Sequence, residues 1–312
     1  MNYRHVYHAG NFADVVKHAV LALCVDHLLN KETPFRVIDV HAGVGRYDLA
    51  GVEAGKTLEY ADGIGRLAGV DAPPIPEGPA AALSPYLEIV RALNGGGPLS
   101  LYPGSPEIAA RMLRSRDRLV VNELHPEDRA SLAANYAGDR RVKVMALDAW
   151  VALKALLPPP ERRGLVLVDP PFERPDEFDS MARGLAEAAR RFATGTLLLW
   201  YPVKDPATVA AFYAAIAPLA PEKILRAELL VRAPSDTAKL NGCGLLIVNP
   251  PWTLREKLGA LLPFLAERLA KGEGAAFRLD ALDPGGADPA KGRPGQTRRD
   301  ARPSGGGVRG RS

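Results

Sequence analysis

The segment FRVIDVHAGVGRY (residues 35–47) joins a short apolar run to two closely spaced glycines. The run at 35–40 is typical of a buried strand, and Gly43 and Gly45 permit a tight turn from this strand into a helix. Such a turn lets a nucleotide-like ligand approach the backbone closely. Because many α/β enzymes carry two glycines after a strand, this segment by itself leaves nucleotide binding an open question.

Six further apolar runs alternate with amphipathic segments, which is typical of a parallel sheet covered by helices. The predicted strands are 35–40, 118–124, 142–148, 164–170, 195–202, 224–232 and 242–250. The predicted helices are 12–30, 106–115, 127–135, 148–156, 176–192, 205–217 and 253–270. The sequence therefore predicts an α/β protein with a seven-stranded, mostly parallel sheet.

The interval between the first two strands is far longer than the roughly 30 residues of an ordinary βαβ unit. Its surplus, residues 50–100, contains two helical patterns, KTLEYADGIGRL and AALSPYLEIVRAL. We therefore predict an inserted helical subdomain at 50–100 within a main domain formed by residues 1–49 and 101–278.

Composition limits the class of protein. The chain has 312 residues and 47% hydrophobic residues, enough for one enlarged α/β domain. Its two cysteines, Cys24 and Cys243, cannot form a disulfide framework, so we expect a cytoplasmic protein. No apolar run approaches the roughly 20 residues that a membrane span requires, and no targeting segment is evident.

The formal net charge of +4 is placed unevenly along the chain. Residues 281–312 contain seven basic and three acidic residues, so the preceding 280 residues are formally neutral. Rich in glycine, proline and arginine, residues 279–312 are predicted to be a disordered tail. Such a tail either adds weak, salt-sensitive affinity for phosphates or only improves solubility.

Polar side chains follow the predicted strands at the edge where doubly wound sheets bind ligands. These are Asp39 and His41 after the first strand, Glu123 after the second and Asp148 after the third. Glu123 is placed to accept both ribose hydroxyls of an adenosyl cofactor, and Asp148 to accept from its adenine amine. Asp148 also has the position of a helix N-cap.

The strongest local signal is LVLVDPPFE (165–173), a buried strand that ends in Asp-Pro-Pro-aromatic. This pattern is similar to the motif of amino-methyltransferases that act on adenine or cytosine. Asp169 and the Pro170 carbonyl can each accept one hydrogen of the exocyclic amine, which favours its pyramidal, nucleophilic form. Phe172 can stack on a flipped-out base.

A second segment, GLLIVNPPW (244–252), also ends a strand in Pro-Pro-aromatic. If the strands have the methyltransferase order 3-2-1-4-5-7-6, the fourth strand lies beside the first and the seventh lies farther away. We therefore assign the reaction to Asp169 rather than Asn249, and assign Trp252 to packing.

The opening segment MNYRHVYHAGNFADVVKH contains His5, His8 and His18. No metal site is predicted, because no cysteine lies near and Asp14 is the only nearby carboxylate. Asn11 has the position of an N-cap with Asp14 three residues on, a variant of the capping box. Val16, Val20 and Leu23 form the predicted core stripe of the first helix, and His18 lies off it.

Seven motifs occur in order: HAGNFADVVKH, HAGVGRY, YPGSP, NELHP, DPPFE, LWYP and NPPW. Together they resemble the large-subunit ribosomal RNA methyltransferase J family over residues 1–278. The resemblance implies a Rossmann-like fold and S-adenosylmethionine-dependent methylation of the exocyclic amine of adenine 2030 in 23S ribosomal RNA. It also implies a monomer without an obligate protein partner and without membrane association.

The resemblance further implies a set of contacts. Cofactor contacts are expected at His18, His41, Gly43, Ser105, Glu123, Asp148, Ala149 and Asp169, and an RNA contact at Tyr3. Where we expect glycine in the family this chain has Ala149, so only a backbone contact is carried over. Ser105 also has the position of an N-cap, with Pro106 at the first helical position. The opening segment would then act as a lid, with Tyr3 toward the RNA and His18 toward the cofactor.

Two other functions stay open at the level of sequence. A DNA adenine methyltransferase shares the catalytic motif but usually carries a recognition region larger than this insert. A non-catalytic RNA-binding or assembly protein on the same scaffold is disfavoured by intact Glu123, Asp148 and DPPF.

Overall fold

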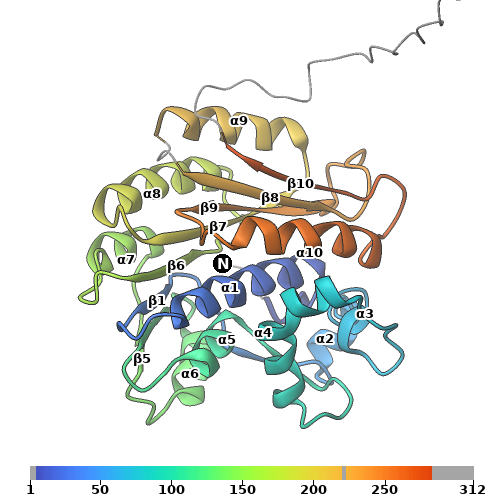
Figure 1. Ribbon diagram of the computed structural model, residues 1–312, viewed down its shortest axis with the longest axis horizontal. Coiled ribbons are helices and arrows are strands. Elements are labelled where there is room, and N and C mark those ends of the chain that lie inside the picture. The colour runs from blue at the N-terminus through green and yellow to red at the C-terminus, as the bar shows by residue number, and fades with distance from the viewer. Residues whose placement is uncertain (1–4, 220–222, 283–312) are drawn as a thin grey trace, which may run out of the picture.

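An eight-stranded sheet forms the centre of the protein (Figure 1), in the order β10-β8-β9-β7-β6-β1-β4-β5. The computed structural model describes residues 5–219 and 223–282. The strands are β1 (Arg36–Asp39), β4 (Arg118–Asn122), β5 (Val142–Met145), β6 (Gly164–Val168), β7 (Thr196–Val203), β8 (Ile224–Leu230), β9 (Gly242–Val248) and β10 (Ala276–Ala281). All seven predicted strands and their predicted order are confirmed. β9 runs antiparallel to both of its neighbours, β7 and β8.

β10 is an eighth strand that the sequence analysis did not predict. It pairs antiparallel with β8 at the edge of the sheet. Its segment AFRLDA alternates apolar and polar residues, as an edge strand with one wet face does. The strand continues through residue 281, so residues 279–281 of the predicted tail belong to the sheet. Most of that tail, residues 283–312, lies outside the described residues.

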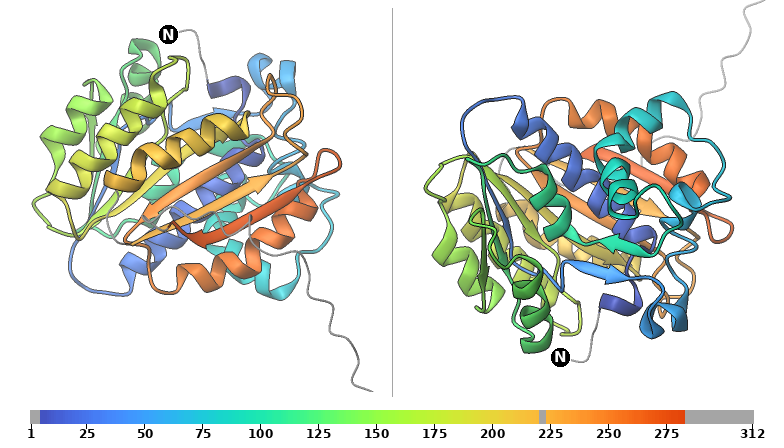
Figure 2. Two further views of the ribbon diagram at one scale, coloured as in Figure 1. Left: turned by 90° about the horizontal axis from the view of Figure 1, so that it is seen from above. Right: turned by 90° about the horizontal axis from the view of Figure 1, so that it is seen from below.

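Two layers of helices cover the sheet, and the predicted helices are confirmed within a few residues at each end. α7, α8 and α9 cover one face, and α1, α5 and α10 lie on the other (Figures 1 and 2). The helices are α1 (Phe12–Leu29), α5 (Ser105–Met112), α6 (Pro126–Asn135), α7 (Ala149–Leu156), α8 (Glu177–Arg191), α9 (Pro206–Ile216) and α10 (Leu254–Arg268). Within the described ranges, none of the helices combines the length and apolar character that crossing a membrane requires.

Successive strand residues supply two separate hydrophobic cores, one on each face of the sheet. Val37 and Leu167 belong to the core beside α1, whereas Ile38 and Val168 belong to the core beside α8. This alternation follows from the two-residue period of a strand, and burial on both faces explains the continuous apolar runs in the sequence.

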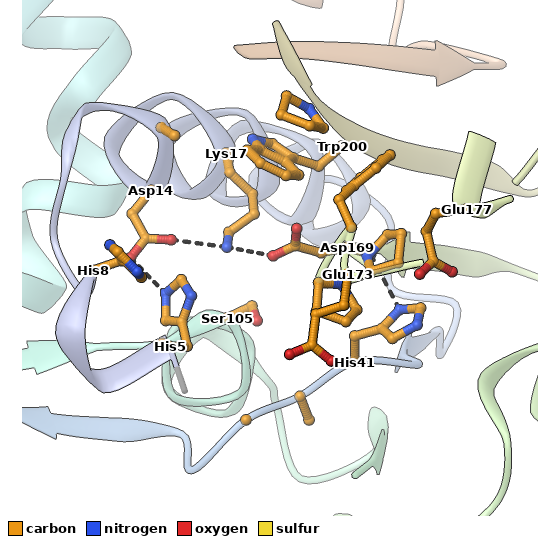
Figure 3. Close-up of a pocket in the computed structure, with 18 of the residues that line it drawn as sticks. His5, His8, Asp14, Lys17, His41, Ser105, Asp169, Glu173, Glu177 and Trp200 are labelled. Carbon is orange, nitrogen blue, oxygen red and sulfur yellow. Dashed lines mark hydrogen bonds and ion pairs between the residues drawn. The ribbon is translucent and has the colours of Figure 1, made fainter. Parts of the chain in front are cut away.

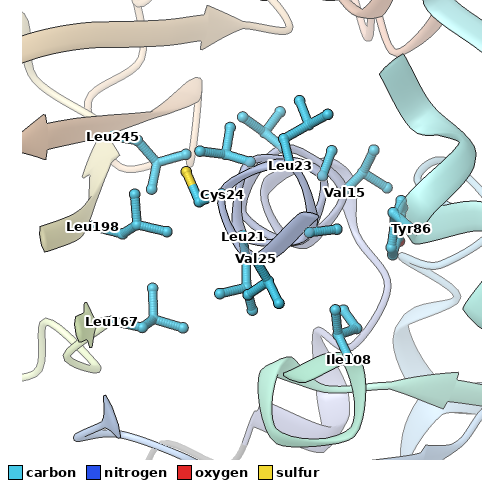
Figure 4. Close-up of a cluster of buried hydrophobic side chains, with 14 of the residues drawn as sticks. Val15, Leu21, Leu23, Cys24, Val25, Tyr86, Ile108, Leu167, Leu198 and Leu245 are labelled. Atoms are coloured by element: carbon cyan, nitrogen blue, oxygen red, sulfur yellow. The ribbon is translucent and has the colours of Figure 1, made fainter. Parts of the chain in front are cut away.

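Helix α1 is buried on nearly all sides, so the predicted single core stripe is wrong. It lies between the sheet and the helices α4 (Glu77–Leu93), α5 and α10, and Figure 4 shows apolar neighbours around its whole circumference. His18, predicted off the stripe, is 1% exposed. The stripe failed as a guide because a helix enclosed by other elements buries every face.

The inserted region contains one long helix and two short ones. The second predicted pattern is confirmed as α4, whereas the first, at 56–67, is mostly turn between α2 (Val52–Thr57) and α3 (Gly65–Ala68). The turn brings Gly63 against the N-terminal segment, where a Cβ on Gly63 would stand 2.1 Å from the carbonyl oxygen of Gly10. The helical pattern is interrupted at Leu58, which ends α2 in the left-handed region at φ 52°.

Two short strands bracket the insert. β2 (Arg46–Asp48) and β3 (Leu101–Pro103) pair antiparallel beside the main sheet (Figure 2). Between them, Leu83, Tyr86 and Val90 of α4 join the same core as α1. The division of the chain into a main domain and a subdomain at residues 50 and 100 stays a prediction.

Candidate active site

A pocket of about 680 Å³ opens at the carboxyl ends of β1, β4 and β6. It brings together the side chains that the sequence analysis selected, although up to 154 positions separate them. The predicted residues that line it are His18, His41, Gly43, Ser105, Glu123, Asp148, Ala149, Asp169, Pro170 and Phe172. Tyr3, the predicted RNA contact, lies outside the described residues. The roles of these residues in binding stay predictions.

The glycine turn after β1 forms one wall of the pocket. Gly43 has φ 62° and a Cβ there would stand 2.4 Å from the Tyr47 hydroxyl, so only glycine fits. The predicted continuation into a helix is wrong, because the chain enters β2 instead. The helix N-terminus at this position comes from α5, which begins at Ser105 after the insert. The insert has thus separated the turn from its helix in sequence but not in space.

Glu123 lies against the glycine turn, as expected for a ribose contact. Its Oε2 accepts a hydrogen bond from the Gly43 N–H at 2.8 Å, and its Oε1 accepts one from the His125 N–H at 2.8 Å. These bonds fix the carboxylate while leaving each oxygen a second lone pair. The carboxylate is therefore oriented for two adjacent hydroxyls.

Asp148 caps helix α7, so the alternative reading of this residue is confirmed. Its Oδ1 accepts from the N–H groups of Trp150 and Val151 at 3.0 and 3.1 Å. Both bonds use Oδ1, so within the described part of the chain the capping contacts leave Oδ2 unused. Capping and a ligand contact are compatible, because the helix N-terminus itself lines the site.

Ser105 is bonded to a buried carboxylate instead of capping its helix. The predicted N-cap is wrong by one residue, since the cap position belongs to Gly104 and no side chain caps the helix. The Ser105 hydroxyl donates to Oδ2 of Asp39 at 2.6 Å, and the His41 N–H donates to Oδ1 at 3.1 Å. Burial raises the pKa of Asp39 to about 6 in spite of these two bonds.

His41 is held as a neutral imidazole next to Asp169. The Asp169 N–H donates to its Nδ1 at 3.3 Å, which requires a lone pair on that nitrogen. Burial lowers the pKa of His41 to about 4. The proton therefore resides on Nε2, which makes that atom a donor toward the pocket.

The DPPF turn extends from β6 into the pocket. Asp169 is 16% exposed, and its Oδ1 makes no hydrogen bond within the described part of the chain. Phe172 packs against Phe178 and Trp200, with ring centroids 4.8 and 5.9 Å apart. Its φ of 51° is rare for an aromatic residue, and such strain often accompanies a functional site. The DPPF turn therefore places Oδ1 of Asp169 and the ring of Phe172 in the same pocket.

Lys17 is the main functional candidate that the sequence analysis missed. Its ammonium donates to Oδ2 of Asp169 at 2.5 Å and lies 2.8 Å from Oδ1 of Asp14 (Figure 3). Burial alone would lower the pKa of Lys17, but the two carboxylates outweigh it and hold that pKa well above its usual value. A usable signal was present, since Asp14 and Lys17 are an i,i+3 charge pair inside an otherwise apolar helix.

The carboxylate of Asp14 links this network to the N-terminal segment. Burial would raise its pKa, but His5 and Lys17 hold the pKa of Asp14 well below its usual value. Its Oδ2 lies 2.9 Å from Nε2 of His5 and accepts from the Gly10 N–H at 2.9 Å. The expected capping box is therefore modified. Asn11 caps the helix as predicted, but the Asp14 carboxylate accepts from the backbone N–H of Gly10.

His18, predicted to contact the cofactor, and His8, which had no assigned role, both line the pocket. Nδ1 of His18 is 2.7 Å from the Tyr102 hydroxyl, and its Nε2 has no hydrogen-bond partner among the described residues. Burial lowers the pKa of His18 well below its usual value, so the ring is neutral. His8 is 3.0 Å from Oε1 of Glu59, which fixes the N-terminal segment to the insert.

The second Pro-Pro-aromatic turn, NPPW, lies at the opposite edge of the sheet, because β9 runs antiparallel to β7. Asn249 donates to the carbonyl oxygens of Ala193 and Gly195. The prediction that Trp252 packs in the interior is wrong, since 83% of its surface is exposed. Across the described ranges, no group of three or more His, Cys, Asp or Glu side chains is arranged to hold a metal ion.

Comparison with known sequences identifies close relatives. A family model described as ribosomal RNA large subunit methyltransferase D, RlmJ, matches residues 32–279. A protein from Haemophilus influenzae, named ribosomal RNA large subunit methyltransferase J, is 41% identical over 285 residues, which are 91% of this chain and 99% of the relative. A protein of the same name from Escherichia coli K12 is 40% identical over 269 residues, 86% of this chain and 94% of the relative.

A solved structure shares the fold. The crystal structure of a protein from Legionella pneumophila matches with a TM-score of 0.79 at 34% sequence identity. The match covers 88% of this chain and 98% of that chain, so it includes the insert as well as the sheet.

Proposed function

Because the chain belongs to the ribosomal RNA large subunit methyltransferase J family, we propose that it methylates the exocyclic N6 amine of an adenine in 23S ribosomal RNA. The proposed position is adenine 2030, the target that the family resemblance implies. The fold is that of the Rossmann-like methyltransferases, and S-adenosylmethionine is the methyl donor.

The pocket fits this cofactor on two observations. First, Gly43 lines the pocket at φ 62°, so the turn presents backbone without a side chain to the ligand. Second, Glu123 and Asp148 line the pocket with carboxylate oxygens, the kind of acceptor that ribose hydroxyls and an adenine amine require. Glu123, Asp148 and the backbone at Ala149 would hold the nucleoside, with His18, His41 and Ser105 near the remainder. When bound, S-adenosylmethionine supplies a methyl group made electrophilic by a positively charged sulfur.

The observation that carries the proposal is the state of Asp169. Lys17 occupies Oδ2, so the carboxylate is fixed in one rotamer and keeps Oδ1 for one hydrogen of the target amine. The Pro170 carbonyl accepts the second hydrogen, and together they favour the pyramidal amine whose lone pair attacks the methyl carbon. As the new C–N bond forms, the amine nitrogen carries a surplus proton, which Asp169 or water accepts.

Phe172 would hold the base in this position. Its ring is backed by Phe178 and Trp200, so it offers a rigid stacking face rather than a mobile side chain. An adenine inside a helix is out of reach of Asp169, so the base is flipped into the pocket before the reaction.

The test is transfer of a tritiated methyl group to three substrates: naked 23S RNA, assembled large subunits and duplex DNA. The labelled nucleotide is then identified by digestion and its position by mapping. We expect N6-methyladenosine in RNA at a single position. Label in DNA would favour the DNA adenine methyltransferase, and binding of RNA without cofactor binding or transfer would favour the assembly protein.

A further inference from the structure

The pocket has two halves of opposite charge. The half beside β1, β4, β5 and β6 is lined by the carboxylates Glu123, Asp128, Asp148, Asp169, Glu173 and Glu177. The half beside β7 is lined by Lys204, Arg232, Lys239 and Lys271, which we call the basic rim. Two further described carboxylates line the pocket outside the acidic half: Asp14, which pairs with Lys17 and His5, and Glu59, which accepts hydrogen bonds from Asn11 and His8. The one arginine of the acidic half among the described residues, Arg174, pairs with Asp176.

The topology of the sheet gathers the basic rim from three segments. Lys204 directly follows β7, and Arg232 and Lys239 lie on the loop that joins β8 to β9. The register pairs Val203 with Gly242, which places this loop at the carboxyl end of β7. Lys271 follows α10, and its N–H donates to the Val231 carbonyl at 2.7 Å. The four cations therefore share the sheet edge with Asp169.

The loop that carries Arg232 and Lys239 is held in place by the buried side-chain amide of Asn241. Asn241 has no exposed surface, and its Nδ2 donates to the carbonyl oxygens of Lys204 at 3.1 Å and Asp236 at 2.7 Å. Its backbone N–H donates to the Val203 carbonyl at 3.0 Å. The spacing between Lys204 and the loop is therefore fixed by the fold.

Part of the positive charge of the basic rim is not neutralised within the protein. Lys239 pairs with Asp236 at 3.1 Å, and Lys271 pairs with Asp62 at 3.3 Å. Lys204 is exposed, and Arg232 is half-buried with an Nε that has no hydrogen-bond partner in the described part of the chain. Neither of these two makes an ion pair with a described carboxylate.

We propose that the basic rim binds phosphodiester groups of the RNA strand on either side of the target adenine. This inference rests on the proposed function and assigns the docking surface that the formally neutral core otherwise lacks. The acidic half matches a positively charged sulfonium cofactor, whereas the basic half would repel it. A ligand that reaches Asp169 and the rim together must carry a neutral base and flanking negative charges, which is the chemistry of a nucleic acid strand.

The experiment compares two triple variants of the full chain with the wild type. Lys204→Gln/Arg232→Gln/Lys239→Gln removes three charges from the rim. Lys143→Gln/Lys154→Gln/Arg255→Gln removes the same charges from exposed positions away from the pocket. Binding of a labelled 23S RNA transcript is measured between about 50 and about 200 mM salt. Methyl transfer to the same RNA and calorimetric binding of S-adenosylmethionine are measured alongside.

We expect the rim variant to bind RNA at least tenfold more weakly, with a slope of log affinity against log salt lower by about 2. Its kcat at saturating RNA and its affinity for S-adenosylmethionine should equal those of the wild type, as should every property of the control variant. If the rim variant keeps wild-type RNA affinity and salt slope, or loses cofactor binding, the assignment of the rim is wrong. Such a result leaves the proposed function intact provided that the wild type methylates RNA; a wild type inactive on RNA would refute both.

Discussion

The two Pro-Pro-aromatic turns of this protein have similar sequences and opposite surroundings. DPPF follows β6, a parallel strand, and opens into the pocket, whereas NPPW follows β9, an antiparallel strand, and lies at the far edge of the sheet. Both contain a residue in the left-handed region, Phe172 at φ 51° and Asn249 at φ 47°. These two residues stand at opposite ends of their turns, Phe172 last in DPPF and Asn249 first in NPPW, so the turns differ in local backbone form. Strand direction decides which turn opens into the pocket.

The polar residue at the head of each turn shows the consequence. One oxygen of Asp169 accepts from a lysine of another element, and its other oxygen is available to a ligand. The side-chain amide of Asn249 donates to two backbone carbonyls. The aromatic residues differ in the same way, since Phe172 is backed by two rings and Trp252 projects into solvent. A Pro-Pro-aromatic turn therefore forms part of the pocket only where the fold brings suitable side chains of distant elements next to it.

The largest expected effect is that of Asp169→Ala, which removes the acceptor of the amine hydrogen. We expect kcat to fall by about 10³-fold or more while the protein stays folded. Single-turnover methyl transfer measures the rate, and circular dichroism checks the fold. Near-normal turnover would contradict the assignment and direct attention to Asn249.

The second-largest expected effect is on how stability depends on pH. DPPF lies near the buried carboxylate of Asp39, whereas NPPW contains no ionisable side chain. Burial raises the pKa of Asp39 to about 6 in the folded protein from the 3.8 of an ordinary aspartate, so the folded state binds the proton more tightly. Lowering the pH from 7 to 4 should therefore raise the wild-type free energy of unfolding by up to about 3 kcal/mol through this residue.

Asp39→Asn lacks this contribution, so the stability difference between variant and wild type should change by that amount across the window. Urea denaturation at pH 7 and at pH 4 measures it, with Asp71→Asn as an exposed control. Parallel pH profiles for Asp39→Asn and the wild type would show that burial does not raise this pKa.

Phe172→Ala should lower kcat/KM by roughly 5- to 150-fold, because stacking on a base contributes about 1 to 3 kcal/mol. Phe172→Tyr, which keeps the stacking face, should retain most of the activity. Steady-state kinetics with RNA as the varied substrate measures both variants. Equal losses in the two variants would indicate that the ring supports the turn rather than the base.

Asn249→Ala should leave kcat unchanged but lower the free energy of unfolding by about 1 to 2 kcal/mol. The variant loses two hydrogen bonds to backbone carbonyls and puts alanine in the left-handed region. Chemical denaturation measures the stability and methyl transfer the rate. A fall in kcat with unchanged stability would reverse the roles given to the two turns.

Trp252→Ala should have the smallest effect, within about 0.5 kcal/mol of wild-type stability and without loss of activity, since the ring is 83% exposed. The same denaturation and transfer assays apply. A marked loss of stability would mean that the indole packs against the protein in solution.

Much of the fold could be predicted because strands buried on both faces produce continuous apolar runs. The same reasoning selected Glu123, Asp148 and Asp169, since each closes such a run and carboxyl ends of parallel strands converge. The errors share one cause. The entry into β2, the Ser105 bond to Asp39 and the burial of His18 all depend on elements that are distant in the sequence.

The sequence by itself determined the order of the strands, the caps at Asn11 and Asp148 and the two candidate turns, because these depend on residue periodicity and local hydrogen bonds. Only the tertiary structure decided which turn opens into the pocket, that Lys17 holds Asp169 across 152 positions, and that a neutral core carries a basic rim. These outcomes depend on strand direction and on contacts between distant elements, and a linear pattern contains neither.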